Sequence, residues 1–368
     1  FTSPHLSSYA ERYVTDGEPI AEGRLAEWIW ALRPVLEAMV RDGWEHPTEF
    51  EVCTAIAFCH FLEQGVDFLV LEVGLGGAID STNVVRPLVT VITNVSRDHM
   101  EQLGRSVVEI ARVKAGIIKE GVPVVTGAHG AALEVIAEAA REKAAPLYLV
   151  GRDVTWRPVS HSLEGQVFDL TGLLGRYEGL RLPLIGRHQM ANAACAVAAV
   201  ELLARAGQAA VTERVVREGL ARTSWPGRLE VVSRRPLVLL DGAHNHDGVR
   251  CLRQALTDYL PDRDVILVIG MLGDKEREKV AEELAPAARA VVVTRPNSPR
   301  AGAWADLADA VRPHCAAVEV VEDPWQAVCR AMEMAGPRDA VVVTGSLYTV
   351  GEVRERFLAT RGAAAGDA

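Results

Sequence analysis

Five short apolar runs, each followed by a helical pattern, fill the last third of the chain and constrain its fold most strongly. Runs of this length, bounded by turn residues and alternating with helices, predict βα units that wind around one sheet. An independently wound α/β domain is therefore expected in this part of the chain. The runs cover residues 237–241, 265–271, 290–294, 318–322 and 340–345.

A less regular alternation precedes this series. A Pro-Gly pair in SWPGRLEVV (224–232) is typical of a turn or hinge. With 368 residues the chain is long enough for two domains, and the hinge predicts a boundary near 226 that separates residues 1–226 from 227–368. Strands are expected at 66–73, 88–95 and 122–126, and short strands and turns over 150–182. Helices are expected at 25–40 (interrupted or restarted at Pro34), 48–63, 105–119, 131–144, 189–206 and 213–221.

Charge and cysteine content narrow the class of protein. The net charge is −10 and no run of five or six like charges occurs, which disfavours a general nucleic-acid binder. No apolar stretch approaches the roughly 20 residues that a membrane-spanning helix needs. The six cysteines form no CxxC pair and lie mostly in apolar stretches, so buried, reduced thiols in a cytoplasmic protein are expected.

Three residues in the first half could meet at one divalent ion. Glu72 ends the run 66–73, His99 follows the run 88–95, and Lys114 lies on the helix expected at 105–119. Parallel strands end at one edge of a sheet, where α/β proteins bind ligands, so Glu72 and His99 are expected to share that edge. A protonated lysine repels metal ions, so Lys114 could join them only if burial lowers its pKa and CO₂ converts the amine to a carbamate. Considered alone, His99 is more typical of a loop histidine that caps a helix, and Lys114 is more typical of a solvated helix lysine.

Polar side chains also gather after other predicted strands and at the start of a predicted helix. The motif DGAHNHDG (241–248) places Asp241, His244 and Asn245 after the first strand of the second series, where packing rarely needs such groups, so a function is favoured. The motifs GMLGDKE (270–276) and TGSLYTVGEV (344–353) repeat this arrangement after two later strands. Near the boundary, Arg228 could reach phosphates from between the domains or simply lie on the surface. Asn192, in the helix start GRHQMANA, could face a nucleotide or serve as an ordinary cap.

Ten motifs in order give the chain its resemblance to a known family. Together they resemble the folylpolyglutamate synthase/dihydrofolate synthase family of the Mur ligase superfamily, and the resemblance covers nearly the whole chain. The motifs are TSPHL (2–6), TEFEV (48–52), LEVGLGGAIDSTNVV (71–85), DHMEQLG (98–104), ARVKAGIIK (111–119), GRHQMANA (186–193), WPGRLE (225–230), DGAHNHDG (241–248), GMLGDKE (270–276) and TGSLYTV (344–350).

The resemblance implies an ATP-dependent amide ligase with a Mur-ligase-like α/β fold. Its N-terminal domain would be of the P-loop ATPase type, and its smaller C-terminal domain would be Rossmann-like and would carry the glutamate-ligase function. The implied substrates are ATP, L-glutamate and either dihydropteroate or reduced folates, and the implied cofactor is a pair of Mg²⁺ ions. A cytoplasmic monomer without nucleic-acid or membrane partners is expected.

The family's site residues carry over to matching positions of this chain. Ser3, Glu72 and His99 match metal ligands, and Lys114 matches a lysine that the family carries as a carbamate. Asn192, Arg228 and Asp241 match ATP contacts, while His244 and Asn245 would lie near the phosphates or the acyl-transfer site, so that Lys114, Asp241 and His244 are the expected catalytic residues. Phe50, Glu51, Asp80 and Ser81 match the pterin-binding region, and Ser346 would assist the incoming glutamate.

Some positions depart from the family pattern. The phosphate-loop motif expected before TSPHL is missing, so we expect that the chain lacks an N-terminal segment and, as given, is inactive because it binds ATP poorly or not at all. His246 stands where proline is usual, Ala78 where a basic residue is common, and Arg97 where leucine is usual. Two alternatives remain: a muramyl-peptide ligase of the same superfamily, and an inactive binding module. The residues at 48–52 and 78–83 favour the folate ligase over the muramyl ligase.

Overall fold

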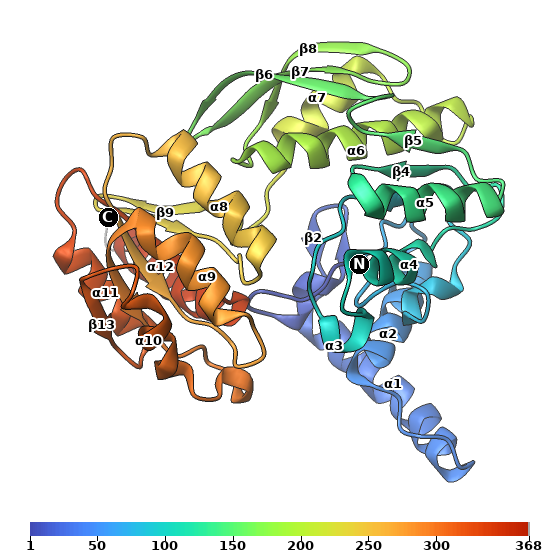
Figure 1. Cartoon of the computed structure of the whole chain (residues 1–368). Coiled ribbons are helices and arrows are strands. Elements are labelled where there is room, and N and C mark those ends of the chain that lie inside the picture. Colours follow the sequence, from blue (N-terminus) through green and yellow to red (C-terminus); the bar gives the residue numbers. More distant parts are fainter. Residues whose placement is uncertain (367–368) are drawn as a thin grey trace.

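The computed structural model describes residues 1–366, and these residues form four separate sheets with helices packed on them (Figure 1). Residues 1–226, called here the N-terminal region, hold three of the sheets. Residues 227–366, the C-terminal region, hold the fourth. The position of the domain boundary itself stays a prediction.

The sheet of the C-terminal region has the order β13-β12-β11-β14-β10-β9, with β9 antiparallel to its neighbour and the other pairs parallel. Each predicted strand of this region is present, and β9 adds one that was not predicted. The strands are β9 (Glu230–Arg234), β10 (Leu237–Leu240), β11 (Val265–Ile269), β12 (Ala288–Val293), β13 (Val318–Val320) and β14 (Ala340–Thr344).

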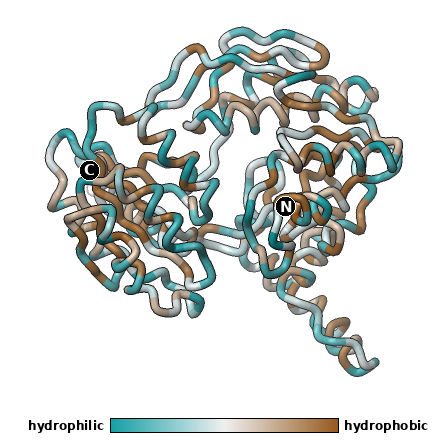
Figure 2. Tube along the Cα trace, viewed as in Figure 1, coloured by the Kyte–Doolittle hydropathy of each residue, from teal (hydrophilic) through white to brown (hydrophobic). Residues whose placement is uncertain are grey.

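Helices cover both faces of this sheet, which explains why β10, β11 and β14 are buried along their whole length. Alternate strand residues pack under α8, α9 and α10 on one face and under α11 and α12 on the other. In Figure 2 the strands form the hydrophobic interior of this region. The helices are α8 (His246–Tyr259), α9 (Arg277–Leu284), α10 (Leu307–Val311), α11 (Pro324–Met334) and α12 (Leu347–Gly366), with short 3₁₀ turns η3 (Ala285–Ala287), η4 (Pro299–Ala301) and η5 (Trp304–Asp306).

The N-terminal region is built on a small parallel sheet, β3-β4-β5, between helices. Helices α4 and α5 pack on one face, and α6 packs on the other and also supports an antiparallel meander, β6-β7-β8. The elements are β3 (Thr90–Ile92), α3 (Met100–Leu103), α4 (Val107–Ala115), β4 (Val124–Thr126), α5 (Gly130–Glu142), β5 (Leu147–Leu149), β6 (Thr155–Ser162), β7 (Gly165–Thr171), β8 (Arg176–Leu182), α6 (Arg187–Arg205) and α7 (Glu213–Ala221).

The strand predicted at 66–73 is wrong. These residues form no strand, and Phe68, Leu69 and Val70 are 48%, 37% and 81% exposed. Among the described residues, the backbone of this segment bonds to a neighbouring chain segment only around Phe1, where Glu72 N–H donates to the Phe1 carbonyl at 3.0 Å and the Phe1 amine donates to the Val70 carbonyl. An apolar run becomes a sheet strand only when its backbone pairs along its length with a neighbouring strand.

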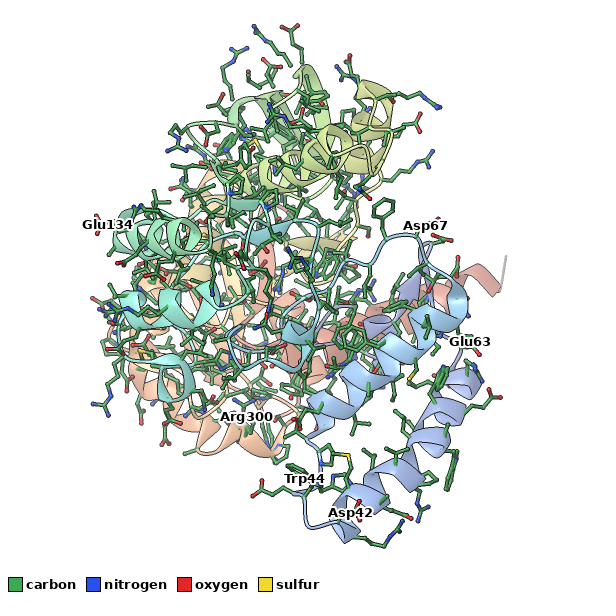
Figure 3. All side chains as sticks on the ribbon, turned by 90° about the vertical axis from the view of Figure 1, so that its right-hand side faces the viewer. Asp42, Trp44, Glu63, Asp67, Glu134 and Arg300 are labelled. Carbon is green, nitrogen blue, oxygen red and sulfur yellow. The ribbon has the colours of Figure 1, made fainter. Side chains whose placement is uncertain are left out.

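The break predicted at Pro34 is also wrong, because α1 (Glu22–Arg41) runs through it as one helix. Proline removes the hydrogen bond to the carbonyl of Trp30, four residues earlier, and Trp30 is 65% exposed, so water can take that place. Helix α1 projects from the rest of the chain beside α2 (Glu49–Gln64), with Trp44 at the turn between them (Figures 1 and 3). The remaining elements here are η1 (Tyr9–Arg12), β1 (Val14–Thr15), β2 (Glu18–Pro19) and η2 (Ser81–Val84).

Two further expectations concern cysteines and membranes. The described cysteines are all free, and three are buried, but Cys251 on α8 is exposed, which corrects the expectation of buried thiols at that position. Across residues 1–366, no helix combines the length and the apolar character that crossing a bilayer requires.

Candidate active site

The segment at the start of the chain meets Glu72. The backbone N–H of Ser3 donates to Glu72 Oε2 at 2.8 Å, and Glu72 Oε1 has no hydrogen-bond partner among the described residues. Burial raises the pKa of Glu72, and the Ser3 N–H and the Arg228 guanidinium oppose that rise. The structure therefore brings Ser3 and Glu72 together and leaves one carboxylate oxygen available to a cation.

His99 lies at the position before α3 with a left-handed backbone (φ 49°) and makes no side-chain cap. Burial lowers the pKa of His99, and Lys275 and His244 add to this effect while Asp98 opposes it. A neutral imidazole is the form that coordinates a metal ion. His99 is thus chemically suited to the ligand role that the sequence predicts.

Lys114 lies in the last turn of α4, and its ammonium has no hydrogen bond or ion pair among the described residues. Burial lowers the pKa of Lys114, although the negative charge of Asp98 works in the opposite direction. A partly buried amine without an anionic partner favours the neutral form, which is the form that reacts with CO₂. This environment fits the predicted carbamate.

The predicted ligands do not form a complete metal site by themselves. Within residues 1–366, no three His, Cys, Asp or Glu side chains converge closely enough to hold an ion. Mg²⁺ is commonly bound by one or two carboxylates together with waters and substrate phosphates. Glu72 and a carbamate on Lys114 would supply oxygens of that kind, so the residues present fit a site that the nucleotide completes.

Asp98 is held by side chains from the other region. It accepts hydrogen bonds from Lys275 Nζ at 2.9 Å and Asn245 Nδ2 at 2.8 Å, and His244 Nε2 lies 3.5 Å away. Burial alone would raise the pKa of Asp98, but these donors outweigh it and hold that pKa well below its usual range. Asp98 is therefore a carboxylate anion next to His99.

His244 and Asn245 both follow β10 and both reach Asp98. The Gly242 carbonyl lies 2.9 Å from His244 Nδ1, so Nδ1 carries the proton that this bond needs, and Nε2 faces Asp98. Asn245 caps α8, because its Oδ1 accepts the Gly248 N–H at 2.8 Å. The structure thus brings together the predicted pair His244 and Asn245 and places it against the loop that carries His99.

Arg228 lies at the junction of the two regions. Its guanidinium packs so closely on Gly242 that a Cβ there would come within 2.8 Å of Nη1. The positive charge of Arg228 acts to lower the pKa values of Glu72, Asp241 and His188. The charge of Arg228 therefore acts on groups of both regions.

Asp241 is only 8% exposed, and both of its oxygens accept backbone hydrogen bonds, from Leu229 N–H and Ala243 N–H at 3.0 Å each. Burial raises the pKa of Asp241, and Arg228 opposes the rise. Its carboxylate thus shapes the loop around Arg228.

At the start of α6, Asn192 is exposed and donates to Gln189 Oε1 at 3.1 Å. The neighbouring His188 is mostly buried, and burial with the charge of Arg228 lowers its pKa to about 4. His188, at the start of this helix, therefore lies within electrostatic reach of Arg228.

The residues predicted for pterin binding lie around the N-terminal half of α2. The ring of Phe50 packs against Gly74 so closely that a Cβ there would come within 2.3 Å of it, which explains the glycine. Ser81 Oγ bonds to Thr54 Oγ1 at 2.9 Å. Asp80 caps η2 and also accepts Leu75 N–H at 2.8 Å, and Glu51 caps α2 through Thr48, so both carboxylates already have backbone partners.

Two more residues of the C-terminal region concern the site: Ser346, which was predicted, and Lys275, which was not. Ser346 is 2% exposed, and its Oγ accepts the Tyr348 N–H at 3.2 Å at the start of α12. Lys275, which the sequence places in a strand-end motif without a role, is 91% buried at its side chain and bonds to Asp98. The repeated polar motif after β11 was the available signal for Lys275.

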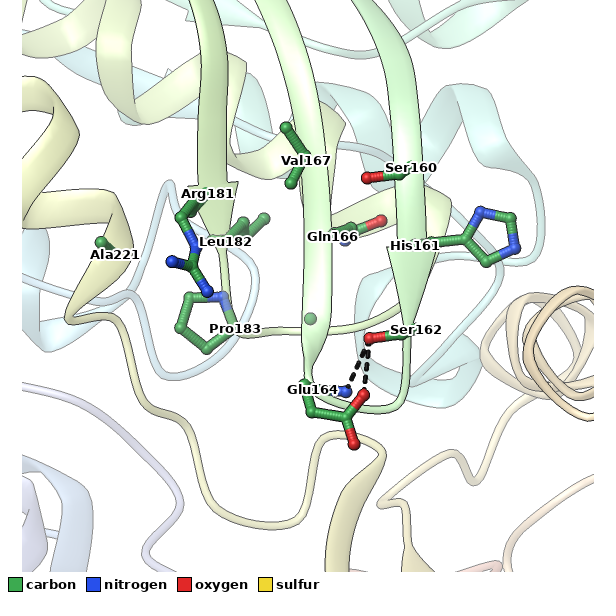
Figure 4. Close-up of a pocket in the computed structure, with 11 residues that line it drawn as sticks. Ser160, His161, Ser162, Glu164, Gln166, Val167, Arg181, Leu182, Pro183 and Ala221 are labelled. Carbon is green, nitrogen blue, oxygen red and sulfur yellow. Dashed lines mark hydrogen bonds between the residues drawn. The ribbon is translucent and has the colours of Figure 1, made fainter.

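A surface cavity of about 340 Å³ opens on the meander, along β6, β7 and the end of β8 (Figure 4). Ser162 and Glu164 bond to each other at its rim. None of its lining residues is a predicted site residue. We place the candidate site at Glu72, His99, Lys114 and Arg228, because electrostatic interactions through Asp241, His244 and Asp98 connect these four residues.

Two family models match parts of the chain. The family model for the Mur ligase middle domain matches residues 38–200, and the model for the Mur ligase glutamate ligase domain matches residues 227–347. The chain is 37% identical over 359 residues to a Bacillus subtilis dihydrofolate synthase/folylpolyglutamate synthase, a match that covers 97% of this chain and 83% of that protein.

Two solved structures show the same fold. Mycobacterium tuberculosis folylpolyglutamate synthase complexed with ADP matches with a TM-score of 0.91 at 34% identity, over 97% of this chain and 83% of that one. Escherichia coli FolC in complex with DHPP and ADP matches with a TM-score of 0.87 at 31% identity, over 98% of this chain and 82% of that one.

Proposed function

Because this chain belongs to the folylpolyglutamate synthase/dihydrofolate synthase family of the Mur ligase superfamily, we propose that it is an ATP-dependent ligase that adds L-glutamate to a pterin or folate carboxylate. Its acceptor would be dihydropteroate, the γ-carboxylate of reduced folates, or both. The observation that carries the proposal is the position of Arg228, which packs against Gly242 at the junction of the two regions and whose charge acts on the carboxylate of Glu72.

The proposed chemistry converts a poor electrophile into a reactive one. An acceptor carboxylate oxygen attacks the γ-phosphorus of ATP, the bond to the bridging oxygen breaks, and ADP leaves. The amine of glutamate then attacks the acyl carbon of the acyl phosphate, phosphate departs with the bonding electrons, and the amine loses a proton. The products are an amide, ADP and phosphate.

The chain's own residues would serve this reaction in three ways. Arg228 would offset the charge on the transferring phosphoryl group, and Asn192 would contact the nucleotide. Ser3, Glu72, His99 and carbamylated Lys114 would hold two Mg²⁺ ions, which supply Lewis-acid stabilisation of the phosphates when bound. His244 and Asn245 would orient groups near the acyl-transfer step, and Asp241 would support Arg228.

The acceptor would lie near α2. Phe50 offers an aromatic face, and Ser81 offers a hydroxyl beside it, which suits a flat heterocycle with polar edges. Asp80 and Glu51 would shape this site through their backbone hydrogen bonds. Ser346, at the start of α12, would assist the incoming glutamate.

The test is a direct assay, with dihydropteroate, ATP, Mg²⁺ and L-glutamate, of the protein purified together with any upstream coding sequence. We expect ADP and a glutamylated product in equal amounts, and none when glutamate is omitted. ADP release with a nucleotide-linked muramyl substrate instead would identify the cell-wall ligase. No turnover with either acceptor, even after any upstream coding sequence is included, would favour an inactive binding module.

The expectation that the chain of 368 residues is inactive on its own stays a prediction, and the same assay on that chain checks it. Monomeric behaviour and the domain boundary near residue 226 also stay predictions. Light scattering and limited proteolysis of the purified protein measure them directly.

A further inference from the structure

One carboxylate of the N-terminal region takes its side-chain hydrogen-bond donors from the C-terminal region. Asp98 receives Lys275 Nζ at 2.9 Å and Asn245 Nδ2 at 2.8 Å, residues 177 and 147 positions away in the chain. His244 Nε2 lies 3.5 Å from the same carboxylate. Within its own region Asp98 accepts only the adjacent His99 N–H, at 2.9 Å, among the described hydrogen bonds.

These partners come from two different loops of the C-terminal region. His244 and Asn245 follow β10, and Lys275 follows β11. A single carboxylate therefore joins both loops to the loop that carries His99. Any movement that separates the two regions removes all three partners from Asp98 at once.

Burial makes this contact costly to lose. The side chain of Lys275 is 9% exposed and that of Asp98 is 23% exposed, and Asp98 is the one described ion-pair partner of Lys275. Removing one member of a buried ion pair leaves the other charge unpaired, which is far more destabilising than breaking a surface pair. The ion pair between Asp98 and Lys275 thus opposes separation of the regions.

Other ion pairs across the same junction are more exposed to solvent and are therefore weaker. Arg234 and Glu164 join β9 to the β6–β7 turn, but their side chains are 59% and 63% exposed. Arg187 pairs with Asp258 at 2.8 Å, and the arginine is 62% exposed. Exposed pairs of this kind contribute little to stability.

We propose that Asp98 is a clamp between the two regions: a positioning residue that, through Lys275, Asn245 and His244, holds the C-terminal region over His99 and the candidate metal site. Its structural role stands on the contacts alone, and its catalytic consequence rests on the proposed function. Substrates would enter and products would leave when the clamp opens, and the acyl phosphate would be shielded from water when it is closed.

The test compares Asp98→Asn with Glu164→Gln, two isosteric substitutions that each remove one charge from an ion pair across the junction. Asp98→Asn should raise deuterium exchange in the loops at 242–248 and 272–276 by at least about tenfold and should increase the radius of gyration in X-ray scattering. Glu164→Gln should change neither measurement. Unchanged exchange and scattering for Asp98→Asn would overturn the clamp.

Lys275→Met provides a second route if Asp98→Asn fails to fold. It should raise exchange mainly in the loop at 272–276, Lys275→Arg should restore protection, and the double variant should be no looser than Asp98→Asn alone, because Lys275 acts through Asp98. Additive effects would show that the two residues act independently and would contradict the proposal.

Kinetics then separate the clamp from the proposed function. Asp98→Asn should lower kcat by about tenfold or more while the Kd for ATP changes much less, since Asp98 makes no described hydrogen bond or ion pair with the predicted ATP contacts Asn192, Arg228 and Asp241. If Asp98→Asn shows the expected rise in exchange but the wild-type protein has no ligase activity, the function is refuted and the clamp is kept. Active variants with wild-type kcat and wild-type exchange would refute the clamp and keep the function.

Discussion

At the scale of single residues, Lys114 carries the most specific chemical claim, because its role requires a modification. Lys114→Ala should abolish ADP release in the Mg²⁺-dependent assay, and short carboxylic acids at millimolar concentration should restore part of it by replacing the carbamate oxygens. Arg112→Ala, an exposed change on the same helix, is the matched control and should leave turnover unchanged. Turnover near the wild-type level in Lys114→Ala would exclude the carbamate.

His188 gives a prediction about pH and stability. Its pKa is lowered to about 4, mainly by burial and further by Arg228. Between pH 6.5 and about 4 the unfolded chain binds a proton here that the folded chain does not, so stability falls as the pH falls through this window and is unaffected above it.

His188→Gln should remove this part of the acid sensitivity. The loss of stability between pH 7 and pH 4 should be smaller in the variant by up to about 3 kcal/mol. Urea unfolding of both proteins at several pH values measures the difference. If both proteins lose the same free energy of unfolding between pH 7 and pH 4, the result would contradict a lowered pKa at His188.

At the scale of elements, Glu201 on α6 ties the helix to the meander. It is 1% exposed and accepts hydrogen bonds from Leu173 N–H at 2.6 Å and from the Tyr177 hydroxyl at 2.8 Å. Glu201→Ala should lower the free energy of unfolding by about 3 kcal/mol, because these donors lose a charged partner in a buried place. Glu213→Ala, which removes an exposed i,i+4 pair with Arg217, should cost only about 0.5 kcal/mol. Thermal unfolding compares the two, and equal losses would contradict the account.

The elements also show where sequence patterns suffice and where they fail. The strands of the C-terminal sheet are predictable because both faces are buried, so each is a continuous apolar run. The run at 66–73 looks the same but forms no strand, because strand formation depends on a partner that the run itself does not encode. The meander is only partly predictable because most of β6 is exposed, which removes the apolar alternation.

At the scale of the whole molecule, the candidate site combines residues that sequence motifs identify with contacts that only the folded chain reveals. The family resemblance identifies Glu72, His99 and Lys114. Of the three, only His99 follows a strand that forms, because the run that ends near Glu72 is not a strand. The pairing of Asp98 with Lys275 was not predictable, because 177 positions separate the two residues and no local pattern links them. The carboxylates of Asp80 and Glu51 accept hydrogen bonds from backbone N–H groups. The residue types alone do not reveal these contacts.

The central claim is that a pterin or folate carboxylate is activated by ATP in a site built from both regions. The most direct test uses dihydropteroate labelled with ¹⁸O in its carboxylate, together with ATP, Mg²⁺ and L-glutamate, and analyses the released phosphate by mass spectrometry. An acyl phosphate requires that one labelled oxygen moves to each phosphate released. ADP formation with unlabelled phosphate, or no ADP formation at all, would contradict the account.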